Sequence, residues 1–181
     1  MRIGQKYITG TFAADQWVKI YENILSSAAT SVTISSLDGD TDEEYRLIVR
    51  GIGGVNSTTL LVRPNNDSGS NYGYQELYGQ GSTAAAARGT FAALIGTPFA
   101  LSANENSLTE LLIYAKSGYV RPVLIESSNK ISGTTVGAVC SDGNVWNNTA
   151  DNITSLVVFS DQTNGLGIGS LIELYKKKYK S

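Results

Sequence analysis

Short segments of alternating apolar and polar residues recur along the chain, separated by glycine, asparagine, aspartate and serine. In residues 44–50, Tyr45, Leu47 and Val49 share one parity, and charged residues occupy most of the other. In residues 31–35, apolar residues alternate with serine and threonine. Because successive side chains of a strand point to opposite faces, this alternation predicts strands with one buried face. We therefore expect two strands here, joined by a turn at residues 37–42.

Further candidate strands follow along the chain, and several of them are apolar on both parities, which is typical of strands covered on both sides. They span residues 58–64, 119–127, 134–141, 154–161 and 170–177. Two other segments, residues 17–25 and 107–117, also carry apolar residues at helical spacing. Both are short and rich in β-branched and aromatic residues, so we expect strands there, with a short helix as the alternative.

Together these segments predict an all-β chain. About eight to ten strands at this spacing, without a sustained βαβ rhythm, indicate an antiparallel β-sandwich, jelly-roll-like, with at most one or two short helices. Residues 64–89 form the longest polar stretch and are rich in turn formers. We expect two loops there, flanking a short strand at residues 74–78.

Composition and charge are those of a single domain spanning residues 1–181. The chain is 41% apolar and 17% charged, with a formal net charge of −2. We expect an extended N-terminal arm at residues 1–14 and a basic tail at residues 177–181. The sequence has no large basic patch and no apolar stretch of the length that a signal peptide or a membrane span needs. We therefore expect neither a nucleic-acid partner nor a membrane partner.

The chemistry available to the chain is restricted, because it has no histidine and a single cysteine, Cys140. This composition removes Ser–His and Cys–His nucleophilic pairs and closed zinc sites. Glycoside hydrolysis needs only two carboxyl groups, but they must converge in one cleft with a raised pKa on one of them. The sequence favours no pair among its scattered acids, which include Glu22, Glu44, Glu76, Glu110, Glu126 and Glu173. We therefore predict that the chain is not an enzyme and has no catalytic residues, no cofactor and no firm metal site.

Two groups of polar residues are candidate binding sites. Asp38, Asp40 and Asp42 form a weak calcium candidate, although the segment lacks the glycine and the glutamate that an EF-hand loop needs at its sixth and twelfth positions. The alternative is an acidic turn whose carboxylates bind nearby backbone amides. The second group combines aromatic rings with amides: Tyr72, Tyr74, Tyr78, Trp146 and Asn147. Such residues serve subunit interfaces and sugar-binding faces alike, and we favour an interface.

Four stretches, in the same order, resemble a group of small virion structural proteins of tailed bacteriophages. They are residues 17–50, residues 63–79 (RPNNDSGSNYGYQELYG), residues 145–158 (VWNNTADNITSLVV) and residues 161–177 (DQTNGLGIGSLIELYKK). The resemblance covers nearly the whole chain as a pattern of turns and strands, and it includes no catalytic signature. It implies a β-sandwich that belongs to an assembled particle.

The resemblance sets the functional expectation. We expect a non-enzymatic structural component of a phage virion, assembled in the host cytoplasm, and specifically a capsid decoration or cement protein. The alternative is a carbohydrate-binding module of a tail or fibre that recognises the host surface. The expected partners are further copies of the chain in a homotrimer, other virion proteins such as the major capsid protein, and, in the alternative, a host-surface glycan.

Overall fold

The chain folds into two antiparallel sheets. The computed structural model describes residues 16–96 and 100–178, and within them lie one short helix and twelve strands. The elements are β1 (Gln16–Ile24), β2 (Ser31–Ile34), α1 (Gly39–Asp42), β3 (Glu44–Ile52), β4 (Leu60–Pro64), β5 (Tyr72–Gln80), β6 (Thr83–Phe91), β7 (Leu94–Ile95), β8 (Asn106–Tyr114), β9 (Arg121–Ser132), β10 (Thr135–Trp146), β11 (Leu156–Ser160) and β12 (Leu171–Lys178).

Eight of these strands have the order of a jelly roll. The larger sheet begins with the order β1-β12-β3-β8, and the smaller sheet has the order β2-β11-β4-β7. If these eight strands are counted alone along the chain, the two sheets read 1-8-3-6 and 2-7-4-5. This is the double Greek-key pattern in which the chain alternates between two packed sheets. The expected all-β sandwich is therefore confirmed.

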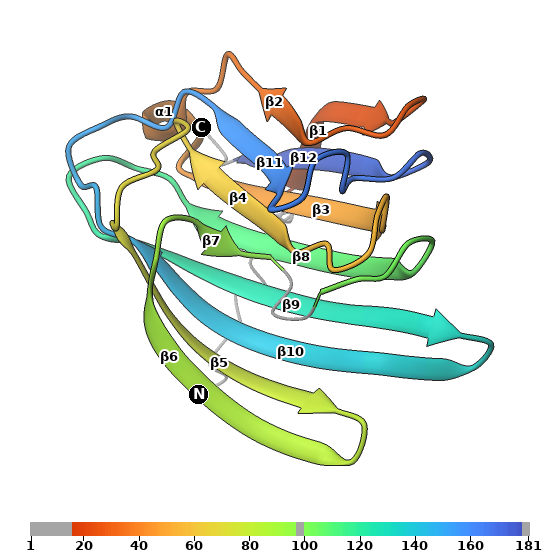
Figure 1. The fold of residues 1–181 in the computed structure, drawn as a ribbon. Coiled ribbons are helices and arrows are strands. Elements are labelled where there is room, and N and C mark those ends of the chain that lie inside the picture. Colours follow the sequence, from red (N-terminus) through yellow and green to blue (C-terminus); the bar gives the residue numbers. More distant parts are fainter. Residues whose placement is uncertain (1–15, 97–99, 179–181) are drawn as a thin grey trace, which may run out of the picture.

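The remaining four strands are two hairpins inserted into this frame. The β5–β6 hairpin interrupts the chain between β4 and β7, and the β9–β10 hairpin interrupts it between β8 and β11. Gly81 and Gly133, which lie in the two hairpin turns, have a positive φ that glycine adopts without strain. Both hairpins extend the larger sheet in the order β8-β9-β10-β5-β6. Figure 1 shows these long, curved strands continuing past the small sheet.

The core lies between the small sheet and the first strands of the large one. Leu47 and Val49 of β3 and Leu111 of β8 are fully buried, as are Val62 of β4 and Val158 of β11 on the opposite sheet. Burial of this apolar surface is the main source of stability. The inserted hairpins extend beyond this core, so the inner face of the large sheet changes from apolar to polar along its width.

The structure agrees with some of the expectations for single elements and differs from others. Residues 17–25 and 107–117 form β1 and β8, so the choice of strand over helix was correct. The turn at residues 37–42 contains the short helix α1, in which the Asp38 side chain accepts from the Thr41 amide. The expectation of loops around a short strand in residues 64–89 was wrong, because β5 and β6 pair in register from Tyr72–Phe91 to Gln80–Thr83.

The predicted ends of the domain fall largely outside the described residues. The N-terminal arm at residues 1–14 lies outside them, as do residues 179–181. Lys177, the first residue of the predicted basic tail, belongs to β12, and its ammonium group lies 3.2 Å from a Glu44 carboxylate oxygen. Within residues 16–96 and 100–178, no helix has the length and apolar character that crossing a bilayer requires.

Close packing between loops predicts a strong effect at Gly53. A Cβ atom at this position would lie 2.1 Å from the Ser102 carbonyl oxygen, a backbone atom that cannot turn aside. We expect Gly53→Ala to lower the free energy of unfolding by about 1–3 kcal/mol, as overpacking does. The control is Gly143→Ala, because a Cβ there would meet only the Gln75 carbonyl oxygen, at 4.0 Å. Equal urea midpoints for the two variants would contradict this account.

Candidate functional site

A polar surface lies on the inner face of the large sheet, where the inserted hairpins leave the apolar core. Tyr74, Glu76 and Tyr78 share one face of β5, and they are the cross-strand partners of Asn144, Asp142 and Cys140 on β10. The polar surface continues across β9 and β8. Ser127 of β9 is the cross-strand partner of both Cys140 on β10 and Thr109 on β8, and Asn129 is the partner of Ser107. We name these ten residues the inner polar strip: Tyr74, Glu76, Tyr78, Ser107, Thr109, Ser127, Asn129, Cys140, Asp142 and Asn144.

Four polar atoms of the strip have no hydrogen-bond partner among the described residues. They are Ser107 Oγ, Thr109 Oγ1, Asn129 Oδ1 and Asn144 Nδ2, and the described part of the chain has no others of this kind. Buried polar groups in folded proteins are nearly always paired, and leaving one unpaired costs about 1–3 kcal/mol. All four lie on one face, so the strip has an unmet capacity to bind hydroxyl or amide groups.

Two acids and a thiol meet at the centre of the strip. The Cys140 thiol donates to Asp142 Oδ1 over 2.7 Å, and one ligand atom each of Glu76, Cys140 and Asp142 lie within 4.8 Å of one another. The pKa of Asp142 is raised to about 6, mainly by burial; the Cys140 thiol lowers it, and the nearby Glu76 and Glu126 carboxylates contribute to raising it. Burial also raises the pKa of Glu76 and of Cys140. The Cys140 thiol therefore keeps its proton at neutral pH, and a substantial fraction of Asp142 is protonated only in mildly acidic solution.

Distance alone would allow the cluster to hold a cation, but its chemistry argues against one. A thiol must lose its proton to bind a metal, and burial together with the Asp142 carboxylate favours the protonated thiol of Cys140. Hard cations such as Ca²⁺ prefer six to eight oxygen ligands, and structural zinc takes four ligands that are mostly cysteine or histidine. We therefore assign no metal to Glu76, Cys140 and Asp142.

Among the described residues, small side chains on β6 leave one side of the strip open. Gly89, Ala87 and Ala85 are the cross-strand partners of Tyr74, Glu76 and Tyr78, and β6 forms the edge of the sheet. A Cβ atom at Gly89 would lie 3.1 Å from the Tyr74 ring, so this ring extends over β6. Tyr74, Glu76 and Tyr78 are half-buried, whereas Asp142 is buried. A ligand can thus approach across β6 and meet the tyrosines before the acids.

The predicted calcium residues do not form a common site. Asp38 accepts from Thr41 and from Asn152 Nδ2, and an Asp40 oxygen accepts from the Ser117 amide. These hydrogen bonds hold the pKa of each carboxyl below its usual range. Asp42 instead accepts from the Tyr45 hydroxyl and pairs with Lys176. The three carboxylates point to separate protein donors, as in the acidic turn that was the alternative.

The predicted aromatic group is divided between the strip and the core. Tyr74 and Tyr78 lie in the strip. The other two rings are buried: Tyr72 donates to the Asp67 carbonyl oxygen over 2.8 Å, and Trp146 Nε1 donates to Asp67 Oδ2 over 2.8 Å. Asn147 is exposed and bonds through its backbone amide to the Asn71 carbonyl oxygen. Neither Tyr72 nor Trp146 presents a ring to a ligand.

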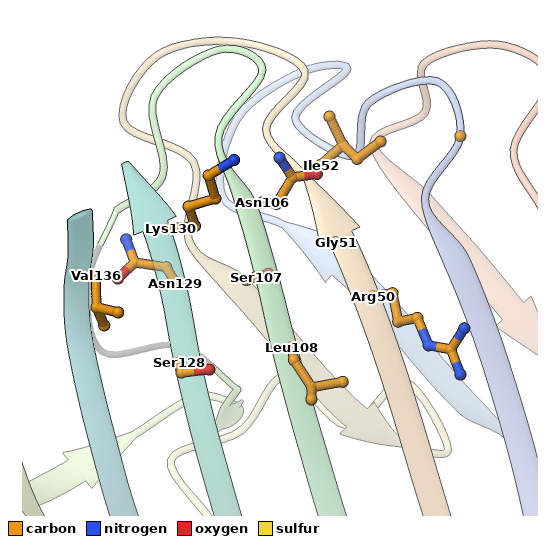
Figure 2. A pocket seen from close by; sticks show the side chains of 11 residues that line it. Arg50, Gly51, Ile52, Asn106, Ser107, Leu108, Ser128, Asn129, Lys130 and Val136 are labelled. Carbon is orange, nitrogen blue, oxygen red and sulfur yellow. The ribbon is translucent and has the colours of Figure 1, made fainter. Parts of the chain in front are cut away.

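Besides the inner polar strip, the sheet has a hollow of about 470 Å³ at the ends of β3, β8, β9 and β10 (Figure 2). Arg50, Leu108 and Ser128 line it in one cross-strand row on the outer face of the sheet, and Lys130 and Val136 complete its rim. All five side chains are exposed. Ser107 and Asn129 of the inner polar strip also line this hollow, so it meets one end of the strip, whereas Thr109 and Asn144 do not line it.

Sequence reasoning missed most of the strip. Asp142, Asn144, Thr109 and Ser127 were not singled out, and Glu76 was only one of several scattered acids. One signal was available, because Cys140, Asp142, Asn144 and Trp146 alternate along residues 140–146. Polar residues on the parity of a buried tryptophan indicate an inward-facing polar row. The pairing of β10 with β5, which brings Asp142 to Glu76, gives no local signal.

Comparisons with known proteins add little to this geometry. No protein-family model matches the chain, and no curated protein matches it. One solved structure is similar. It is an alginate lyase mutant in complex with an alginate tetrasaccharide, with 11% sequence identity, a TM-score of 0.31, and coverage of 86% of this chain and 78% of that chain.

This finding corrects one prediction. The expectation that the chain is not an enzyme is contradicted, because the protein that it resembles is a lyase, and we withdraw that expectation. At such a TM-score the likeness carries no argument for a particular reaction or substrate. What the chain binds or does must be argued from its own residues.

Proposed function

We propose that the chain is a glycan-binding β-sandwich of a tailed-phage particle, and that a neutral polysaccharide binds along the inner polar strip. The observation that carries the proposal is the set of unpartnered polar atoms on this one face. A saccharide offers a dense array of hydroxyl groups that donate and accept, and the unpartnered hydroxyls and amides of the strip can do the same. The virion setting is supported by the resemblance of the sequence to tailed-phage structural proteins.

The tyrosines suit the apolar faces of sugar rings. Tyr74 and Tyr78 are four residues apart on β5, so their Cα atoms are separated by about 13 Å along the strand. Aromatic rings present large apolar faces with a polar edge. The hydroxyl and amide groups lie on the neighbouring strand β10 and, farther across the sheet, on β9 and β8, so a ligand of several sugar units would meet rings and hydrogen-bonding groups together.

Charge selects among glycans. Within the part of the chain that the structure describes, the strip contains two carboxyl groups and no lysine or arginine. Above pH 6, where Asp142 is mostly ionised, an anionic chain such as alginate would be repelled. The proposal therefore names neutral glycans and expects weak binding of uronate polymers.

The test is binding of the purified protein to soluble glucans, galactans, mannans and N-acetylglucosamine polymers, with alginate as the anionic comparator. We expect saturable binding of a neutral polymer by calorimetry, and a loss of at least about tenfold in affinity, ~1.4 kcal/mol, in the Tyr74→Ala/Tyr78→Ala variant. Leu77→Ala is the matched control, because Leu77 lies between the two tyrosines on the exposed outer face. Failure to bind any neutral polymer, or equal losses in both variants, would overturn the proposal.

Attachment to the particle has a candidate surface on the outer face of the large sheet. Leu124 of β9 is the cross-strand partner of Leu112 on β8, and both are exposed, as are Leu77, Leu108 and Val139 on the neighbouring strands. Exposed apolar residues that gather on one face are typical of association surfaces. Capsid decoration and the homotrimer remain predictions, which co-sedimentation with empty capsids and light scattering would examine.

A further inference from the structure

We propose that Glu76 and Asp142 form a catalytic pair that hydrolyses a glycosidic bond of the polysaccharide bound on the inner polar strip. This inference rests on the proposed function, because it requires the same ligand on the same face. It goes beyond binding by assigning a reaction class and a role to each acid.

The geometry of the pair matches what the reaction needs. A carboxylate oxygen of Glu76 and one of Asp142 lie within 4.8 Å of each other, on adjacent strands in one cross-strand row. Retaining glycoside hydrolases hold their two carboxyl groups about 5–5.5 Å apart, whereas inverting ones need about 6.5–9.5 Å to admit a water molecule. Because this separation is shorter than the inverting range, the pair is more compatible with retention of configuration at the anomeric carbon than with inversion.

A second observation, independent of the acids, points to a ligand at the same place. Asn144 follows Asp142 on the same face of β10, is nine-tenths buried, and its Nδ2 has no partner among the described residues. On the other side, Thr109 Oγ1 is fully buried and equally unpartnered, in the row of Cys140. The unpartnered Asn144 amide is thus adjacent to the acid pair, Thr109 lies two strands away from Asp142 across the sheet, and the half-buried tyrosines flank Glu76 on β5.

The environment separates the roles of the two acids. Burial raises the pKa of Asp142 to about 6, so a substantial fraction carries a proton in mildly acidic solution. The charged and titratable groups that influence it are Cys140 on its own strand, Glu76 from β5 and Glu126 from β9. Glu76 is less enclosed and lies toward the open β6 side. Asp142 is accordingly the acid and Glu76 the nucleophile.

The reaction proceeds in two balanced steps. In the first, a Glu76 carboxylate oxygen bonds to the anomeric carbon, the glycosidic C–O bond breaks, and the proton of Asp142 moves to the departing oxygen. In the second, a water oxygen bonds to the anomeric carbon, the ester bond to Glu76 breaks, and the water proton moves to Asp142. The sum is one glycosidic bond and one water molecule converted into two sugar chain ends. The Cys140 thiol, which donates to Asp142 Oδ1, orients that carboxyl group.

The experiment incubates the protein with whichever neutral polymer binds, and follows new reducing ends and the anomeric configuration of the product by NMR. We expect cleavage with retention, faster near pH 5–6 than at pH 8. Asp142→Asn and Glu76→Gln should each lower turnover by about 100-fold or more, as loss of acid–base catalysis does. Glu110→Gln, on the outer face of β8, is the matched control and should retain full activity.

The outcomes separate the two proposals. A polymer that binds, but yields no new reducing ends at any pH from 4 to 8, would overturn the catalytic pair and leave the glycan-binding function standing. Cleavage that survives in both acid variants would also overturn it, because the reaction would then use other groups. Unchanged binding of the polymer by Asp142→Asn would show that its lost turnover is chemical rather than structural.

Discussion

Replacing Trp146 by alanine is expected to lower the free energy of unfolding by about 3–5 kcal/mol, the range for truncating a buried aromatic side chain. Trp146 is fully buried at the end of β10, where its ring lies 4.8 Å from the guanidinium carbon of Arg121. Its Nε1 donates to Asp67 Oδ2, which ties β10 to the loop before β5. Truncation would remove the apolar contacts, the cation–π contact and this hydrogen bond together.

Urea unfolding followed by circular dichroism would measure the effect. Trp146→Phe keeps most of the volume and loses only the donor to Asp67, so we expect a smaller loss of about 1–3 kcal/mol. Phe91→Ala, at an exposed position on the edge strand β6, is the control and should fall within about 0.5 kcal/mol of the unmodified protein. A small effect of Trp146→Ala, equal to that of Phe91→Ala, would contradict the assignment of Trp146 to the core.

A second large effect is expected from pH, through Asp142. Its pKa is about 6 in the folded protein against a usual 3.8, so folding favours the protonated carboxyl. The stability that this group contributes is fully present below about pH 4 and is lost as the pH rises through 6. A difference of about two pKa units corresponds to ~3 kcal/mol. Asp142→Asn, which cannot ionise, should therefore be more stable than the unmodified protein at pH 8, and the two should converge near pH 4.

The pH range in which stability changes distinguishes the contribution of Asp142 from the contributions of the other carboxyl groups. Asp38, Asp40 and Asp67 have lowered pKa values, so their contributions are lost only as the pH falls below about 4. Comparing Tm for Asp142→Asn and the unmodified protein across pH 4–8 isolates the buried acid. Parallel curves over that window would mean that Asp142 titrates as an exposed carboxyl does.

The sequence predicts the strands of the two-sheet core better than it predicts the residues of the candidate site. Alternation at Tyr45, Leu47 and Val49 and the apolar run in residues 154–161 are local signals, and both predict their strands correctly. The hairpin of β5 and β6 was not predicted, since its alanines and glycines carry little apolar signal. Small residues serve there because the rings of neighbouring residues such as Tyr74 extend over them.

The site was missed for a different physical reason. Glu76 and Asp142 are remote in sequence, and each alone resembles a solvent-facing acid of a strand. They meet because the two inserted hairpins pair with each other through β5 and β10. No local sequence pattern predicts that pairing. The candidate aromatic residues could therefore be named from the sequence, whereas the proximity of Glu76 to Asp142 could not be predicted.

The position of β12 has a consequence for how the chain is made. This final strand lies between β1 and β3, and it pairs with both. Until the ribosome has released Leu171–Lys178, β1 has no neighbour in its sheet, and one edge of β3 is open. The two inserted hairpins, in contrast, can close from adjacent segments as they emerge. The inner polar strip can therefore take shape before the frame that supports it is complete.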